Sequence, residues 1–264
     1  MSTVRKTSFE LSGAGGGPLR GDVRTAGSGA GRPPVVLIHG SQGFKDWGFF
    51  PHLAERLARA GMTAISVNLS TSGVGPDGET YLEPEREGQG NRWNDLADVA
   101  AVCGALRDGM LREGLVPADR YGFFGHGRGG ATAVLHAAGD VAVRALVTWA
   151  AAVRPLQGDA DTVGSWRARR QLDDQAASSE TPDVAGAAAR VGAPWLILHG
   201  DADETVSVHE ADELWRAANR HTAQIFLVPA GTHAFGCTHP WAGQTAELAS
   251  AVDRTVRWFS QYLF

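Results

Sequence analysis

The chain reads Tyr-Gly-Phe-Phe-Gly-His-Gly-Arg-Gly-Gly over residues 121–130, and this stretch decides the fold. Its first four residues are mostly apolar and predict a short buried strand, while the alanine-rich residues 131–138 predict a helix. The glycines between them permit a tight reversal of the chain. The stretch therefore predicts a strand, a sharp turn and a helix, which is one unit of an α/β fold.

Short apolar runs alternate with longer stretches of helical period on both sides of this unit. The predicted buried strands are 35–38, 63–67, 121–124, 145–149, 195–198 and 224–228. The predicted helices begin near Gly48, Arg92, Gly129, Ser207 and Trp241. Two short edge strands are expected upstream, around residues 9–11 and 19–23. This order is typical of a mostly parallel, twisted sheet flanked by helices.

One connection is much longer than the others. After the strand predicted at 145–149, residues from about 150 to 192 are rich in Ala, Asp and Arg and lead only then into the next strand. We expect them to form a small helical cap over the carboxyl edge of the sheet, where open α/β folds place their sites. The chain shows no internal repeat, and we expect residues 1–264 to form a single domain.

Composition argues against several classes of protein. Twenty-four Lys and Arg against 29 Asp and Glu give a formal charge of −5, so no basic surface for nucleic acid is indicated. Cys103 and Cys237 are too few for a disulfide framework, and no apolar run approaches the roughly 18 residues of a membrane span. The first residues lead into no apolar signal segment, so we expect a cytoplasmic protein. The sequence leaves the oligomeric state open.

The glycine turn has the spacing of a nucleophile elbow. In the motif G-x-S-x-G, small neighbours let a serine stand above the sheet at the positive end of the following helix. Gly125, Gly127 and Gly129 keep this spacing, with Gly127 at the position of the serine. Glycine tolerates a strained backbone better than any other residue, so the turn can persist without its nucleophile.

Two later segments present an acid and a base. Residues 195–206 read as a buried strand and a turn that exposes Asp203, and residues 228–236 place His233 in the loop beyond the next strand. A carboxylate in that position would orient the imidazole for proton transfer. Upstream, a glycine turn follows the strand at 35–38. Its backbone N–H at Ser41, together with that of Arg128, is expected to form an oxyanion hole.

Together these motifs resemble the α/β-hydrolase superfamily, and within it the dienelactone hydrolases and bacterial serine esterases. The resemblance covers nearly everything from about residue 19 to 264. It rests on five segments in family order: His39-Gly40, 43–50, 125–130, 199–203 and 233–236. It implies acyl transfer through a Ser-His-Asp triad, with no metal and no organic cofactor. Gly127 departs from the family pattern at the nucleophile.

This departure leaves several functions open. Loss of the serine costs about 10⁶ in kcat in subtilisin, so ordinary covalent esterase turnover is not expected. Either an original serine has been replaced, or the natural protein has glycine there. In the second case His233 and Asp203 can still serve as a general acid and base in hydrolysis by water, elimination or cyclisation. A further alternative is a catalytically silent binding protein. The expected ligand is a small, partly apolar ester or lactone.

Four residues are candidates for contact with the substrate. Gln42 and Phe44 follow the upstream turn, Trp149 ends its strand, and Trp166 lies in the predicted cap. Aromatic rings at such places can wall a pocket. The alternative for Phe44 and Trp149 is packing in the core, and for Trp166 it is a solvated helix face.

Three histidines and a cysteine near the site have simpler interpretations. His126 and His199 belong to strand-end motifs and are expected to be packed, hydrogen-bonded scaffold. Cys237 and His239 lie close to His233, but no further ligands with recognisable spacing accompany them, so no metal is assigned. Cys237 could replace the missing nucleophile, although a small buried thiol is the commoner role.

Overall fold

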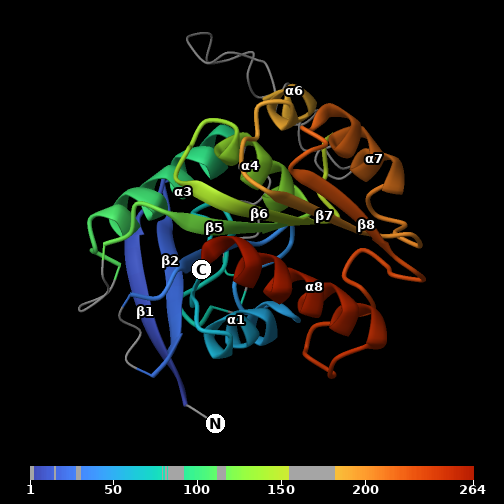
Figure 1. The fold of residues 1–264 in the computed structure, drawn as a ribbon. Helices are drawn as coiled ribbons and strands as arrows, with labels where there is room; N and C mark the ends of the chain where they lie inside the picture. The colour runs from blue at the N-terminus through green and yellow to red at the C-terminus, as the bar shows by residue number, and fades with distance from the viewer. Residues whose placement is uncertain are drawn as a thin grey trace, which may run out of the picture.

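An eight-stranded sheet runs through the molecule (Figure 1). The computed structural model describes residues 3–14, 16–27, 31–78, 80, 82, 92–111, 117–154 and 182–264. The strands are β1 Val4–Ser12, β2 Pro18–Ala26, β3 Pro34–Ile38, β4 Thr63–Asn68, β5 Tyr121–His126, β6 Val143–Trp149, β7 Trp195–Gly200 and β8 Ala223–Val228. Their order in the sheet is β1-β2-β4-β3-β5-β6-β7-β8. All neighbours from β4 to β8 pair in parallel, so the predicted α/β-hydrolase fold is confirmed.

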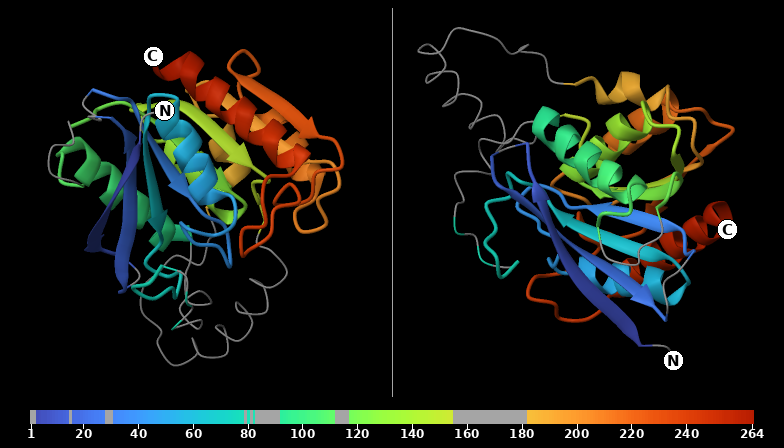
Figure 2. Two further views of the ribbon diagram at one scale, coloured as in Figure 1. Left: turned by 90° about the horizontal axis from the view of Figure 1, so that it is seen from below. Right: turned by 90° about the vertical axis from the view of Figure 1, so that its left-hand side faces the viewer.

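The first two strands are longer than the sequence predicts. They form an antiparallel hairpin of nine paired residues each, which runs across the front of the right-hand view of Figure 2. The expectation that both are short edge strands is wrong for β2, because residues 20–24 also pair with β4. Most of β2 is buried, whereas β1 alternates between exposed and half-buried residues. Only β1 therefore forms this edge of the sheet.

Helices cover both faces of the sheet (Figure 1). One face carries α1 Phe50–Arg59 and α8 Ala246–Leu263, and the other carries α3 Arg92–Arg107, α4 Arg128–Ala137, α6 Val184–Ala188 and α7 Val208–Ala217. Two separate clusters of buried apolar side chains fill the layers between helices and sheet. A sheet covered on both faces explains why its central strands read as continuous apolar runs.

Four of the predicted helix starts lie within about two residues of the observed ones, and the fifth is wrong. The last helix begins at Ala246 instead of near Trp241. Thr245 is its N-cap, and the hydroxyl oxygen of Thr245 accepts a hydrogen bond from the N–H of Leu248 at 3.1 Å. A threonine that caps the first turn is a local signal for a helix start, and it outweighs the apolar character of Trp241.

The carboxyl ends of β3, β5, β7 and β8 lie at the same edge of the sheet, because these strands run parallel. The loops that follow them carry the predicted site residues. Of the expected cap, the structure describes residues 150–154 and 182–192, which include α6. The remainder of the cap prediction lies outside the described residues.

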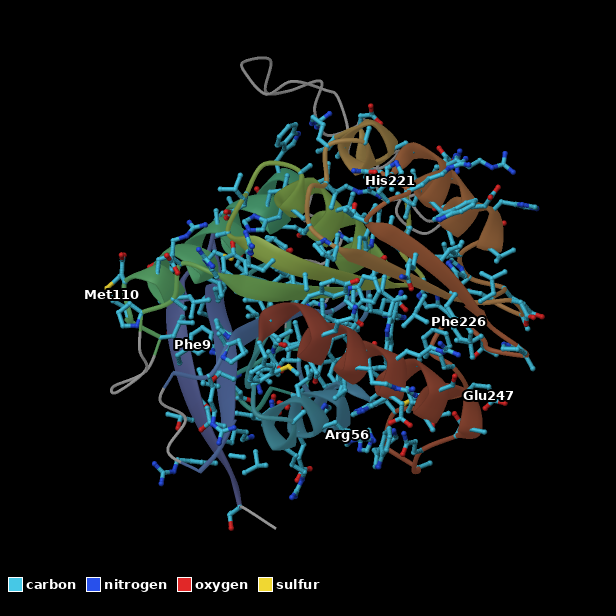
Figure 3. The ribbon with its side chains drawn as sticks, viewed as in Figure 1. Phe9, Arg56, Met110, His221, Phe226 and Glu247 are labelled. Carbon is cyan, nitrogen blue, oxygen red and sulfur yellow. The ribbon has the colours of Figure 1, made fainter. Side chains whose placement is uncertain are left out.

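The two ends of the sheet are marked by Phe9 on β1 and Phe226 on β8, which are labelled at opposite sides of Figure 3. Phe226 is half-buried, with the guanidinium carbon of Arg254 3.4 Å from the centre of its ring. Among the described helices, none combines the length and apolar character that crossing a bilayer requires.

Candidate active site

The turn between β5 and α4 has an unusual backbone. Gly127 adopts φ 55° and ψ −120°, a conformation that L residues rarely enter. Its N–H donates to the carbonyl of Trp149 at 2.9 Å, which ties the turn to the end of β6. The flanking glycines are required by space, because a Cβ atom on Gly125 would lie 2.1 Å from the carbonyl oxygen of Gly129. This crowding explains why small residues surround the turn.

His233 and Asp203 are joined by a hydrogen bond. Nδ1 of His233 lies 2.9 Å from Oδ2 of Asp203, so the N–H at Nδ1 donates to the carboxylate. The side chain of Asp203 is fully buried, while that of His233 is 22% exposed. Burial raises the pKa of the Asp203 carboxyl, but hydrogen bonds from His199 and His233 outweigh it and bring the pKa below its usual value. Asp203 is therefore an anion at neutral pH.

The other nitrogen of His233 faces the turn at Gly127. A Cβ atom added to Gly127 would lie 3.3 Å from Nε2 of His233 and 3.6 Å from its Cε1. The structure thus brings Gly127, His233 and Asp203 together from three different loops. Gly127 itself contributes no Cβ atom or hydroxyl group facing Nε2, since glycine has no side chain.

The two segments predicted to hold an oxyanion pack against each other. A Cβ atom on Gly40 would lie 3.7 Å from Cα of Gly127, so the turn after β3 abuts the turn after β5. Ser41 follows Gly40 directly, and its hydroxyl oxygen is buried without a hydrogen-bond partner among the described residues. Arg128 is the first residue of α4, where the helix dipole is positive. The two predicted donors, the backbone N–H groups of Ser41 and Arg128, therefore belong to turns that lie next to each other.

The side chain of Arg128 points away from the turn. Its Nε and Nη2 donate to the two carboxylate oxygens of Asp95 at 2.7 and 3.0 Å, and Asp95 is fully buried on α3. A paired guanidinium of this kind fixes the first turn of α4 against α3. Arg128 can thus contribute its backbone to the site while its side chain stabilises the helix.

His39 fixes the turn after β3 to the end of β4. Its Nδ1–H donates to the carbonyl of Gly40 at 2.8 Å, and Nε2 accepts from the N–H of Leu69 at 3.2 Å. Burial lowers the pKa of His39 to about 4. The unfolded chain therefore binds a proton at this histidine below about pH 6.5, which the folded chain does only near pH 4.

We expect His39→Gln to make stability less sensitive to acid. Because the pKa of His39 is lower in the folded state, its stabilising contribution is complete above pH 6.5 and is lost as the pH falls towards 4. The substitution should reduce the slope of unfolding free energy against pH in that window by up to about 1.4 kcal/mol per pH unit. Urea unfolding over a pH series measures this slope. His221→Gln, at the exposed residue labelled in Figure 3, is the matched control, and equal slopes in both variants would contradict the prediction.

Two histidines that the sequence assigns to the scaffold touch the site. Nε2–H of His126 donates to the carbonyl of His233 at 3.0 Å, and the two rings lie 4.5 Å apart. Burial, together with the neighbouring His233, lowers the pKa of His126 to about 3, so it stays neutral. His199 contacts the carboxylate of Asp203 itself, at 3.2 Å. The sequence does not predict this contact, although His199 and Asp203 are four residues apart at the end of a predicted strand, a spacing that could have indicated it.

The substrate contact predicted for Trp149 is corrected by the burial of its side chain. Trp149 is fully buried, with ring centres of Phe49, Phe124 and Phe235 within 5.1 Å, and its Nε1–H donates to Thr255 at 2.9 Å. The prediction that it lines a pocket is wrong, because the ring points into the layer between sheet and α8.

Phe44 has the packing role that the sequence left as an alternative. It is 2% exposed, and its ring lies edge-on to that of His239 at 5.1 Å. Gln42 is exposed on the same turn and has a positive φ of 53°. Trp166 lies outside the described residues, so its predicted contact stays a prediction.

Cys237 and His239 hold the loop after His233 against the rest of the site. Nδ1 of His239 accepts from the N–H of Gly48 at 3.2 Å. Burial raises the pKa of the Cys237 thiol to about 11, which argues against its use as a replacement nucleophile. Within the described ranges, no three His, Cys, Asp or Glu side chains are grouped so that they could hold a metal ion.

A base and its carboxylate at the carboxyl edge of a sheet of this order define an α/β-hydrolase. The family model of the dienelactone hydrolases matches residues 22–263, so the chain belongs to the dienelactone hydrolase family. No curated protein sequence matches it.

Solved structures share the fold over nearly the whole chain. A cold-adapted esterase from an Arctic intertidal metagenomic library is 22% identical, with 99% of this chain and 95% of that chain covered and a TM-score of 0.67. A dienelactone hydrolase from Anabaena variabilis is 18% identical, with 99% of each chain covered and a TM-score of 0.67. The esterase domain of a Rhodothermus marinus protein is 15% identical, with coverage of 98% and 100% and a TM-score of 0.65.

Proposed function

We propose that the protein hydrolyses a small ester or lactone by general-base catalysis, with His233 activating a water molecule. One observation carries the proposal: Nε2 of His233 lies 3.3 Å from the position of a Cβ atom on Gly127, and its Nδ1 is held by Asp203. A nucleophilic oxygen bound in the space of the absent side chain would be within reach of Nε2. Membership of the dienelactone hydrolase family supports the class of substrate.

The proposed reaction proceeds without a covalent enzyme intermediate. Water attacks the carbonyl carbon while its proton passes to Nε2 of His233, and the carbonyl electrons move onto the oxygen. The backbone N–H groups at Ser41 and Arg128 stabilise that oxyanion. When the tetrahedral adduct collapses, the leaving alkoxide takes the proton from His233. The products are an acid and an alcohol, or a hydroxy acid from a lactone.

Asp203 has a defined part in this scheme. Its carboxylate holds His233 with Nε2 unprotonated and directed at Gly127, and it stabilises the imidazolium that forms during the attack. The depressed pKa of Asp203 means that the carboxyl group stays ionised throughout. The missing serine nevertheless limits the rate. An oxyanion hole and binding alone retain on the order of 10³–10⁴ over water in subtilisin, and we expect general-base catalysis by His233 to add to that rate.

The test is the substitution His233→Gln in the otherwise unchanged protein. Removing a general base lowers rates by about 10²–10⁴, so hydrolysis of 4-nitrophenyl acetate and of a small lactone should fall by that factor. His221→Gln, at an exposed histidine, is the control and should leave the rate unchanged. Equal rates in the two variants would disprove the proposal. Product analysis separates hydrolysis from elimination or cyclisation, since only hydrolysis incorporates oxygen from solvent.

A further inference from the structure

A second histidine binds the carboxylate that orients His233. His199 is the penultimate residue of β7, and its side chain is fully buried. Its Nε2 lies 3.2 Å from Oδ2 of Asp203 and 2.9 Å from the carbonyl oxygen of Val206. The same Oδ2 is the atom that accepts from Nδ1 of His233 at 2.9 Å. Two imidazoles therefore converge on one carboxylate oxygen.

The partners of His199 determine its protonation. A carbonyl oxygen only accepts hydrogen bonds, and Asp203 is ionised, so Nε2 of His199 faces two acceptors and must carry a proton. Its Nδ1 is buried and has no hydrogen-bond partner among the described residues. A second proton there would be a buried donor without an acceptor, which is costly. A proton on Nε2 follows from these contacts.

The remaining contacts of Asp203 come from its own turn. Oδ1 accepts from the N–H groups of Thr205 and Val206 at 2.8 and 2.9 Å. These donors are two and three residues further along the same loop, so they move with the carboxylate when the loop moves. His199 is different because it belongs to β7, a strand inside the sheet between β6 and β8. It links the carboxylate of Asp203 to a strand of the sheet, in addition to the hydrogen bond from the backbone N–H of Asp203 to the carbonyl of Gly200 at the end of β7.

We infer that His199 is a positioning residue whose Nε2–H is shared between the carbonyl oxygen of Val206 and Oδ2 of Asp203, and that it so fixes Oδ2 where Nδ1 of His233 meets it. An effect of His199 on catalysis rests on the proposed function, in which His233 is the general base. Its structural content, a directed hydrogen bond that aligns the acid with the base, is independent of which reaction occurs. The hydrogen bond from His199 also contributes to the depressed pKa of Asp203.

The first test uses the unchanged protein. Nitrogen-15 NMR of histidine-labelled protein reports which ring nitrogen of His199 carries the proton, after assignment by comparison with a His199→Gln sample. We expect the proton on Nε2 at neutral pH. A proton on Nδ1 would leave only a lone pair facing Asp203 and Val206 and would overturn the inference, whatever the activity of the protein.

The second test compares two substitutions. His199→Gln keeps an amide N–H near the position of Nε2, whereas His199→Leu keeps an apolar side chain of similar bulk without a donor. The readout is the downfield proton resonance of the Nδ1–H of His233 in its bond to Asp203. It should persist in the glutamine variant and weaken or vanish through solvent exchange in the leucine variant.

His136→Leu is the control for loss of a half-buried, hydrogen-bonded histidine away from the site. His136 lies on α4, near the opposite edge of the sheet, where its Nε2 bonds the hydroxyl of Tyr121 at 2.8 Å. This variant should be destabilised while the His233 resonance stays unchanged. A folded His199→Leu protein that retains the resonance would overturn the inference. If His199→Leu does not fold, His199→Met, a flexible apolar side chain without a donor, takes its place in the same measurement, and a retained His233 resonance would again overturn the inference.

Turnover provides a separate readout. In the chain with Gly127→Ser, we expect His199→Leu to lower kcat with little change in KM, and His199→Gln to restore most of kcat. A leucine variant with full kcat would contradict the inference. Failure of the proposed function is recognised differently, by retention of turnover in His233→Gln, and it leaves both NMR tests valid.

Discussion

Replacing Gly127 with serine is expected to raise hydrolysis of 4-nitrophenyl acetate by about three to six orders of magnitude. The upper limit is the roughly 10⁶ in kcat that loss of the serine costs in subtilisin. The added Cβ atom would lie 3.3 Å from Nε2 of His233, so a rotation about χ1 brings the hydroxyl into hydrogen-bonding range of that nitrogen. The serine hydroxyl could then donate its proton to His233, which is already hydrogen-bonded to Asp203, so no further substitution is needed.

The same substitution should reduce stability. Gly127 has φ 55° and ψ −120°, and a residue with a Cβ atom in such a region costs about 1–3 kcal/mol. A melting temperature lower by several degrees is expected for a chain of this size. Gly127→Ala is the matched control, because alanine introduces the same backbone strain without a hydroxyl group.

Two comparisons make the serine prediction decisive. The alanine variant should lose as much stability as the serine variant but gain no activity. Adding His233→Gln to the serine variant should remove the gain. Activity that rises equally with alanine, or that survives loss of His233, would show that the geometry around Gly127 does not support nucleophilic catalysis.

Trp149→Ala is expected to lower the free energy of unfolding by about 3–5 kcal/mol, the usual cost of emptying a site filled by a large aromatic ring. Trp149 is fully buried among three phenylalanine rings, and its indole N–H is bonded to Thr255 on α8. The loss corresponds to a fall in melting temperature of roughly 6–20 °C. Thermal and urea unfolding would measure both quantities.

Enzyme kinetics separates packing from substrate contact at this position. In the Gly127→Ser protein, Trp149→Phe keeps most of the ring volume and should change KM by less than about twofold, since differences below roughly 0.4 kcal/mol are expected for a residue outside the site. If the side chain of Trp149 instead lined the substrate pocket, its substitution would change stability little and KM strongly. That result would restore the interpretation drawn from the sequence.

The sequence predicts the strands of this protein well because each is a short apolar run bounded by turn residues. The six buried strands all occur, within two residues of their expected ends. β2 is not the edge strand that its sequence suggests, since it also pairs with β4, about 40 residues away. α8 begins at Ala246 and not near Trp241, because the side chain of Thr245 caps its first turn. Local sequence patterns therefore predict where the strands lie along the chain, but not which strands pair with each other in the sheet.

In the candidate site, too, some features can be predicted from the sequence and others cannot. The turn at Gly127 and the placement of Asp203 and His233 in loops beyond parallel strands follow from glycine spacing and strand order. The direction of the Trp149 side chain could not follow, because a residue at the end of a strand covered on both faces can point along the edge or into a helix layer.

The amino-acid sequence by itself determined the class of fold, the missing side chain at position 127 and the order of acid and base along the chain. These depend on periodicity, on glycine and on residue identity, which are local properties. Only the tertiary structure decided that His199 shares Oδ2 of Asp203 with His233 and that Trp149 belongs to the core. Such contacts depend on how loops from separate strands converge to within about 3 Å, a distance that spacing in the sequence does not encode.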